Sequence, residues 1–192
     1  MELIVVRHGR TDANARRRLP VSGGIPLDDV GREQVRRTAE RLLDEAPRVS
    51  AVYTSDAARA RQSAALLRRA LCPELPVMAD LRLREIDWGA LRGGRTDAGA
   101  EGGETALARW ARDPTVRLPG GESLLDVRAR VRDFLRAVPA TAGDGAVLVV
   151  SHAVTLTVLT AEVARWPLLD TWHAHRAHLG TGQYRRLVPA AP

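Results

Sequence analysis

Residues 3–14 read LIVVRHGRTDAN, four apolar residues that lead directly into Arg7 and His8. An apolar run without alternation predicts a strand that is buried on both faces, which is typical of parallel sheets. An arginine and a histidine at the end of such a strand contribute little to packing. We therefore interpret them as candidates for function.

Further strands can be placed along the chain. Residues 145–150, GAVLVV, form a second unbroken apolar run. Shorter runs predict strands over residues 49–53 and 75–79, and residues 179–188 predict an edge strand. Residues 189–192 are expected to fray.

The segments between these strands show the apolar spacing of amphipathic helices. Apolar residues recur at spacings of three and four in residues 35–46, behind Asp28 as the expected cap, and again in residues 124–138. Another helix is expected over residues 57–71, with residues 54–56 as its cap. Strands that alternate with helices predict an α/β fold, here a three-layer helix/sheet/helix domain with a mainly parallel sheet.

The length of 192 residues fits one domain. We expect residues 1–192 to form it, with a small cap inserted at about residues 89–121, where glycine, arginine and glutamate are frequent. No apolar run reaches the roughly 20 residues of a membrane helix and no signal segment is seen, so a cytoplasmic location is expected. Cys72 is the only cysteine, which excludes an internal disulfide.

The charge of the chain is basic, with a net charge of +6 and a pI near 10.9. All 29 basic residues are arginines, and they are spread along helices among carboxylates instead of forming a basic tail. We therefore expect no nucleic-acid partner. The charge is weak evidence for anionic ligands in general.

Polar residues follow four of the predicted strands at their carboxyl ends. Arg7 and His8 follow the first strand, and Arg59 lies in the first turn of the helix after the second. Glu85 follows the third strand, and His152 follows GAVLVV. Ligands of open α/β sheets bind outside the carboxyl ends of the strands, so these residues are expected to share one pocket.

These residue types suit a phosphoryl group. Guanidinium groups offer planar pairs of donors to phosphate oxygens, and a neutral imidazole can attack phosphorus. Positive charge near the imidazole also opposes its protonation. A carboxyl group can protonate the leaving oxygen, a role for which we favour Glu85 over its neighbour Asp87.

Six motifs in order resemble the histidine phosphatase superfamily, which includes the cofactor-dependent phosphoglycerate mutases. RHGRT is similar to the RHG(E/Q)T signature of that family, and Asn14 falls at its usual asparagine. PLDDVGREQV, YTSDAARARQSA, LREIDWGALRG, PGGES and VLVVSHA resemble further segments. One such motif is weak evidence, but the ordered set is specific. LREIDWG and PGGESLLDV are also similar to α-ribazole phosphatase and its broad-specificity relatives.

The resemblance implies a role for each residue of the predicted pocket. His8 would be the nucleophile that forms a phosphohistidine, and Glu85 the proton donor. The phosphoryl oxygens would be bound by Arg7, Arg59 and His152. The resemblance implies no metal and no other cofactor.

Other positions are weaker candidates for substrate binding. Thr11 and Asn14 match positions that line the pocket in the family, and Ser22 and Gly23 lie where a rim loop is expected. Arg10 departs from the usual Glu or Gln. It either supplies a further cation for a doubly anionic substrate or points to solvent, and we slightly favour solvent.

The function predicted in this way is a metal-independent phosphomonoesterase acting on a small phosphorylated metabolite. One alternative is a mutase, although mutases of the family usually carry larger insertions than the short segment between Glu85 and PGGES. The other is a non-catalytic module that holds a phosphorylated ligand, which would have no use for a proton donor. The substrate is not fixed by the sequence, and neither is the oligomeric state, where a homodimer stays open.

Two groups of residues leave alternatives open. His173, His175 and His178 suggest a metal site, but their spacing fits neither a helix face nor a zinc pattern, so we expect solvated or capping histidines. Trp88 and Trp110 either cover the pocket or fill the core.

Overall fold

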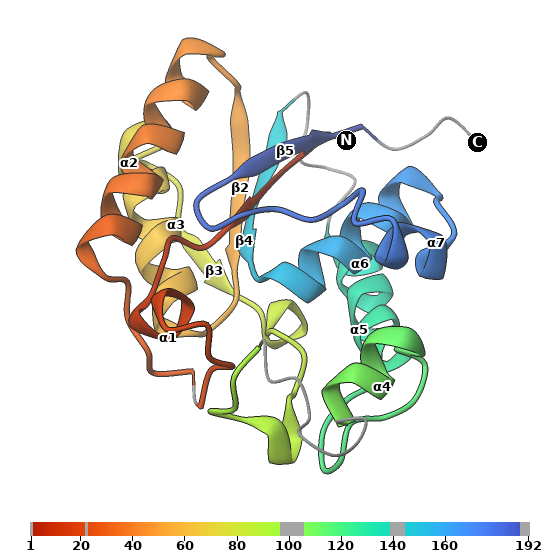
Figure 1. The fold of residues 1–192 in the computed structure, drawn as a ribbon. Coiled ribbons are helices and arrows are strands. Elements are labelled where there is room, and N and C mark those ends of the chain that lie inside the picture. The colour runs from red at the N-terminus through yellow and green to blue at the C-terminus, as the bar shows by residue number, and fades with distance from the viewer. Residues whose placement is uncertain (1, 22, 97–105, 139–144, 189–192) are drawn as a thin grey trace.

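The computed structural model describes residues 2–21, 23–96, 106–138 and 145–188. In these residues five strands form one sheet in the order β3-β2-β4-β1-β5 (Figure 1). The neighbours from β3 to β1 are parallel, and β5 is antiparallel to β1. β5 is the edge strand predicted over residues 179–188, although it begins only at Tyr184. The strands are β1 (Glu2–Arg7), β2 (Val49–Thr54), β3 (Val77–Ala79), β4 (Ala146–Ser151) and β5 (Tyr184–Leu187).

The central strands are buried on both faces, as their unbroken apolar runs predict. Leu3 and Val5 of β1 enter one core cluster, whereas Ile4 and Val6 enter the other. Both clusters need apolar side chains, because successive residues of a strand point to opposite faces. This explains why the run does not alternate with polar residues.

Helices cover both faces of the sheet and give three layers (Figure 1). On one face lie α2 (Asp29–Asp44) and α3 (Ala58–Leu71). On the other lie α5 (Leu124–Ala137), α6 (Ala153–Ala164) and α7 (Leu168–His173). The predicted α/β architecture is thus confirmed. None of the described helices is long and apolar enough to cross a membrane.

Short elements connect these layers. They are α1 (Asp12–Ala15), α4 (Ala106–Arg112) and the 3₁₀ turns η1 (Leu81–Leu83) and η2 (Gly89–Leu91). The expected cap contains η2 and α4, and its residues 97–105 lie outside the described part of the chain. Trp110 of α4 is buried in the core, and its ring meets Trp88 and Trp172 edge-on, at centroid distances of 5.6 and 5.0 Å.

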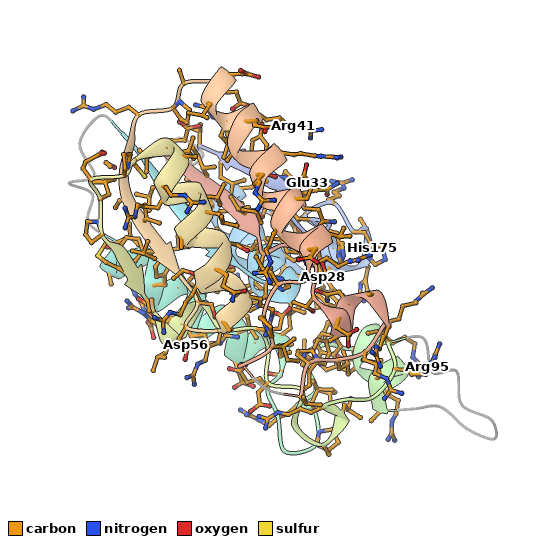
Figure 2. All side chains as sticks on the ribbon, turned by 90° about the vertical axis from the view of Figure 1, so that its left-hand side faces the viewer. Asp28, Glu33, Arg41, Asp56, Arg95 and His175 are labelled. Carbon is orange, nitrogen blue, oxygen red and sulfur yellow. The ribbon has the colours of Figure 1, made fainter. Side chains whose placement is uncertain are left out.

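The starts of α2 and α3 differ in how they are capped. The Asp28 carboxylate accepts a hydrogen bond from Gly31 N at 2.7 Å, as predicted, and Figure 2 shows it at the base of the helix whose exposed face carries Glu33 and Arg41. The prediction that residues 54–56 cap α3 is wrong. Ala57 is the N-cap, and its methyl side chain cannot accept a hydrogen bond. Ser55 Oγ accepts from Ala57 N at 3.3 Å, outside the helix, and also lies 2.9 Å from His152 Nε2.

Two glycines let α2 approach the residues that follow β1. A Cβ atom on Gly9 would lie 2.2 Å from the carbonyl oxygen of Gly31, and one on Gly31 would lie 2.0 Å from that of Arg10. Both distances are far inside van der Waals contact, and backbone atoms cannot move aside cheaply. The space that the absent side chain of Gly9 leaves is thus filled by the backbone of α2.

We expect Gly31→Ala to lower the free energy of unfolding by more than about 2 kcal/mol, because the new methyl group would force the two backbones apart. Helix propensity alone would make the alanine variant more stable by about 1 kcal/mol. A loss of stability would therefore have to come from the steric clash. Urea unfolding measures the effect. Gly23→Ala is the matched control, since its Cβ would meet no atom closer than 3.9 Å. Equal stability of the two variants would contradict the steric argument.

Candidate active site

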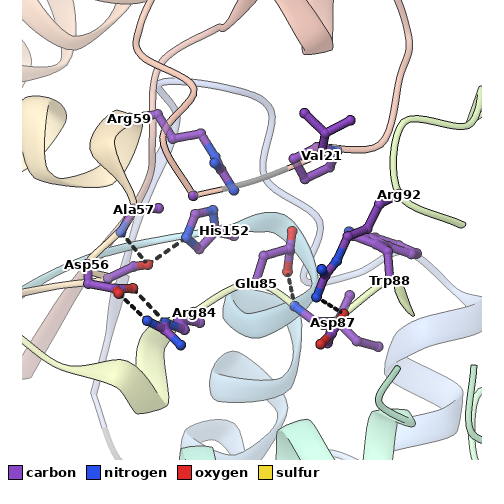
Figure 3. A pocket seen from close by; sticks show the side chains of 14 residues that line it. Val21, Asp56, Ala57, Arg59, Arg84, Glu85, Asp87, Trp88, Arg92 and His152 are labelled. Carbon is purple, nitrogen blue, oxygen red and sulfur yellow. Dashed lines mark hydrogen bonds and ion pairs between the residues drawn. The ribbon is translucent and has the colours of Figure 1, made fainter. Parts of the chain in front are cut away.

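The carboxyl ends of the parallel strands bring the predicted site residues together. His8 N donates to Ser151 O at 3.0 Å, which holds the residue after β1 against the end of β4. Ser55 N donates to Val150 O at 3.0 Å and holds the end of β2 in the same way. Figure 3 shows Arg59, Glu85 and His152 around the resulting pocket.

The His8 ring is held as a neutral imidazole in one tautomer. Its Nδ1 lies 2.7 Å from the carbonyl oxygen of Gly9, which can only accept, so Nδ1 carries the proton. Nε2 therefore has a free electron pair, and Arg59 Nε donates to it at 3.3 Å. Burial, then the charges of Arg59 and Arg7, lower the pKa of His8 from 6.5 to about 3, against the hydrogen bond to Gly9. His8 is thus neutral at physiological pH, with Nε2 unprotonated.

A second buried histidine lies beside the first. The rings of His8 and His152 meet edge-on with centroids 5.0 Å apart. Nε2 of His152 lies 2.9 Å from Ser55 Oγ, whereas its Nδ1 is buried without a hydrogen-bond partner among the described residues. Burial, followed by the charge of Arg59, lowers the pKa of His152 well below its ordinary value. One nitrogen of the ring is therefore left without a hydrogen bond to the described residues.

The partly buried Arg7 and the buried Arg59 supply the positive charge of the site. Nη1 of Arg7 donates to Leu179 O at 2.7 Å, and its Nε has no partner in the part of the chain that the structure describes. Burial is the largest cause that lowers the pKa of both Arg7 and Arg59, and the charge of Glu85 opposes it. Guanidinium groups remain protonated even so. Two cations held away from water in this way favour an anionic ligand.

The carboxylate of Glu85 sits at the N-terminus of α6. Its Oε1 accepts hydrogen bonds from the backbone N–H groups of Ile86, Val154 and Thr155 at 3.1 to 3.3 Å. Its Oε2 accepts only a longer one, at 3.4 Å from Val154 N. Oε1 is therefore largely saturated, and Oε2 keeps capacity for a proton or a substrate.

A cavity of about 400 Å³ opens over these groups. Of the predicted residues, Gly23, Arg59, Glu85 and His152 line its wall. His8 lies behind them, in contact with Arg59 and only 3% exposed. The other lining residues are Pro20, Val21, Ser55, Asp56, Ala57, Arg84, Ile86, Asp87, Trp88 and Arg92.

Several weaker candidates are not brought to this wall. Thr11 and Asn14 bond to each other in a capping box of α1. The side chain of Arg10 turns to α2, where its Nε donates to the Asp28 carboxylate at 2.8 Å. Neither of the two alternatives predicted for Arg10 includes this ion pair. The ion pair links the segment after His8 to the start of α2. Ser22 lies outside the described residues.

Sequence reasoning missed three residues of the pocket. Ser55 was considered only as a helix cap, although its place directly after a strand was the signal that marked the other site residues. Arg84 and Arg92 flank Glu85 and pair with Asp56 and Asp87 (Figure 3). Arginines are so frequent in this chain that nothing in the sequence distinguishes these two.

The three neighbouring histidines do not form a cluster that could bind a metal. His173 Nε2 donates to Arg112 O at 3.1 Å, and the rings of His175 and His178 meet edge-on with centroids 6.1 Å apart. Within the described residues no group of three or more His, Cys, Asp or Glu side chains is placed to hold a metal ion.

The two neutral histidines should make the fold sensitive to acid. A histidine whose folded-state pKa lies below its unfolded value destabilises the native state as pH falls through the unfolded value, because the unfolded chain then binds more protons. For His8 this window extends from 6.5 down to about 3. In this window the unfolding free energy of the wild type should fall as the pH is lowered. In His8→Gln this slope should be smaller by up to about 1.4 kcal/mol per pH unit. Urea unfolding from about pH 4 to about pH 7 measures it, and equal slopes in the two proteins would count against a neutral, buried His8.

Comparison with known proteins places this geometry in context. A model of the histidine phosphatase superfamily (branch 1) matches residues 3–186. The chain is 34% identical over 161 residues to 2,3-bisphosphoglycerate-dependent phosphoglycerate mutase of Methylobacterium sp. (strain 4-46), an alignment that covers 82% of this chain and 77% of the mutase.

Solved structures are similar over nearly the whole chain. Mycobacterial glucosyl-3-phosphoglycerate phosphatase in complex with VO3 is 31% identical, with a TM-score of 0.79 and coverage of 97% of this chain and 92% of that one. The α-ribazole phosphatase of Shigella flexneri is 27% identical, with a TM-score of 0.78 and coverage of 97% and 89%.

Proposed function

The chain belongs to the histidine phosphatase superfamily, and on that premise we propose that it is a phosphomonoesterase that forms a phosphohistidine on His8. The observation that carries the proposal is the state of that residue. A neutral imidazole whose Nε2 is unprotonated and accepts a hydrogen bond from the buried Arg59 guanidinium has the electron pair that attack on a phosphoryl group requires. A module that only held a phosphorylated ligand would gain nothing from this tautomer.

The phosphoryl group is proposed to bind among the buried donors. Arg59 lies at the pocket wall, and the buried Nε of Arg7 and Nδ1 of His152 have no other partner among the described residues. These groups can bond to the equatorial oxygens, whose negative charge they would neutralise in the transition state. The similarity to a phosphatase whose structure contains VO3 supports this placement.

The first chemical step would transfer the phosphoryl group to the enzyme. The Nε2 electron pair of His8 forms a bond to phosphorus while the ester P–O bond breaks. The leaving oxygen takes a proton from the Glu85 carboxyl group, for which Oε2 is the less saturated oxygen. The alcohol then departs.

The second step would return His8 to its starting state. Glu85, now a carboxylate, removes a proton from a water molecule whose oxygen attacks phosphorus. The N–P bond breaks, its electron pair returns to Nε2, and inorganic phosphate is released. The arginines and the imidazole of His152 supply the charge stabilisation in this scheme, so no step calls for a metal ion.

The nearest alternative is a mutase, in which the phosphohistidine returns its phosphoryl group to a reoriented substrate instead of to water. The similarity to the Methylobacterium mutase is the observation that favours it. The two functions share the first step and differ in whether water reaches the phosphohistidine. Similarity to two phosphatases with TM-scores of 0.78 and 0.79, together with the shortness of the segment after Glu85, supports hydrolysis.

Phosphate release from a broad panel of phosphate esters tests the proposal, with His8→Ala as the blank. We expect release from at least one class of small ester, none of it dependent on a bisphosphate primer. Isomerisation of phosphoglycerate that needs the bisphosphate primer and outpaces phosphate release would favour the mutase. Binding of esters without any turnover would favour the non-catalytic module.

A further inference from the structure

We propose that Arg130 and Glu122 form a clamp that positions Glu85 for proton transfer, so that both are positioning residues of the reaction. The inference rests on the proposed function, in which Glu85 is the proton donor. Neither residue lines the pocket, and no role is predicted from the sequence for either, although Glu122 belongs to the PGGES motif. The clamp consists of the guanidinium of Arg130 on α5 and the carboxylate of Glu122 just before that helix.

Arg130 holds the backbone on the N-terminal side of Glu85. Its Nη1 donates to two carbonyl oxygens, Arg82 O at 2.6 Å and Arg84 O at 2.7 Å. Arg84 O also accepts from the Thr155 hydroxyl of α6. The peptide that enters Glu85 is therefore bonded both to α5 and to the helix whose N-terminus receives the Glu85 carboxylate.

Glu122 holds the backbone on the C-terminal side. Asp87 N donates to its Oε2 at 2.9 Å, and Glu122 N donates back to Asp87 O at 2.9 Å. Arg130 joins the two halves, because its Nε and Nη2 donate to the two oxygens of the Glu122 carboxylate at 3.0 and 3.2 Å. The four residues from Arg84 to Asp87 are thus fixed at both ends by one ion pair.

The ion pair of Arg130 and Glu122 is less exposed and makes more hydrogen bonds than an ion pair that only stabilises a helix surface. The Arg130 side chain is only 17% exposed, and each of its three guanidinium nitrogens has a partner. Planar donors in this geometry fix orientation as well as distance. Displacement of a catalytic group by about 1 Å can cost on the order of a hundredfold in rate, so a device that fixes the Glu85 backbone bears directly on catalysis.

Arg128 provides a matched control on the same helix. It also makes an ion pair with a glutamate, Glu162 of α6, but its guanidinium has no hydrogen bond or ion pair with any of the residues from 82 to 87. Arg132 bonds to the same glutamate, so Glu162 keeps a partner when Arg128 is replaced. Arg128→Met therefore removes an arginine and an ion pair from α5 and leaves the clamp intact.

The experiment compares two leaving groups. Para-nitrophenolate departs without needing a proton, whereas the alkoxide of an alkyl phosphate such as glycerophosphate needs one. We expect Arg130→Met to lower kcat/KM for the alkyl phosphate about 10- to 100-fold and for para-nitrophenyl phosphate less than about threefold. Arg128→Met should change neither. Glu122→Gln, which keeps an oxygen for Asp87 N, should lose less than Glu122→Ala.

Glu85→Gln is measured alongside, so that the clamp and the donor role can fail separately. If Glu85→Gln is selective for the alkyl substrate and the clamp variants are not, the inference is overturned and the proposed function stands. If Glu85→Gln shows no selectivity, the donor role falls and the inference falls with it. An equal loss on both substrates in Arg130→Met, matched by a loss of melting temperature, would show a purely structural role. If Arg130→Met fails to fold, Glu122→Gln and Glu122→Ala test the clamp instead. The measurement is again kcat/KM for the alkyl phosphate compared with para-nitrophenyl phosphate.

Discussion

His8→Ala is expected to lower kcat for every phosphate ester at least about a thousandfold, because the reaction loses its nucleophile and no neighbouring group can replace it. His152 is the nearest imidazole, but its Nε2 is engaged by Ser55, and in the proposed binding mode its Nδ1 bonds to a phosphoryl oxygen and not to phosphorus. Phosphate release under saturating substrate measures the effect. The binding of inorganic phosphate should persist, since Arg7 and Arg59 remain.

The control for this variant is His173→Ala, which removes an exposed histidine that does not line the pocket and should keep full activity. Circular dichroism establishes that His8→Ala is folded. A folded His8→Ala protein with the phosphate release of the wild type would contradict the proposed mechanism outright.

Arg59→Met is expected to lower kcat/KM about a thousandfold, which corresponds to roughly 4 kcal/mol of transition-state stabilisation. Two effects contribute, because Arg59 lines the pocket and also donates to Nε2 of His8. Its charge is one of the causes that lower the pKa of His8, so that pKa should rise in the variant. The acid limb of the kcat/KM profile should therefore move to higher pH.

Arg61→Gln is the matched control, since Arg61 is an exposed arginine on the same helix. It should leave both the rate and the profile unchanged. Arg59→Lys should recover part of the rate, because it restores the charge without the planar donors. An Arg59→Met profile with an unshifted acid limb would show that Arg59 does not control the protonation of His8.

The fold could be predicted from the sequence to the extent that burial determines it. The unbroken runs in β1 and β4 reveal strands buried on both faces, and the spacing of apolar residues reveals α2 and α5. The boundaries of short elements were less accurate. The expected strand over residues 75–79 begins only at Val77, because what precedes it is a turn held by a single backbone bond from Leu75 N to Cys72 O.

The site could be predicted where a functional side chain directly follows the carboxyl end of a strand. His8 and His152 follow β1 and β4 directly, so their convergence needs only the parallel sheet. The clamp could not be predicted in this way, since Arg130 reaches residues 46 and 48 positions away and resembles every other arginine of its helix in the sequence. The ion pair between Arg10 and Asp28 was not predicted either, because the two residues lie far apart in the sequence and arginines are frequent in this chain. A cytoplasmic location, the absence of a nucleic-acid partner and a homodimer stay predictions.

The central claim is that a phosphoryl group is carried on Nε2 of His8, and trapping that adduct tests it most directly. The enzyme is mixed with a turned-over ester and quenched within one turnover in alkali, because phosphohistidine is unstable in acid. Peptide mass mapping then locates the modification. We predict one phosphoryl group on the peptide that contains His8, absent from His8→Ala and accumulating in Glu85→Gln if that carboxylate activates the water. Turnover of the ester with no phosphorylated peptide, or with the group on another residue, would contradict the account.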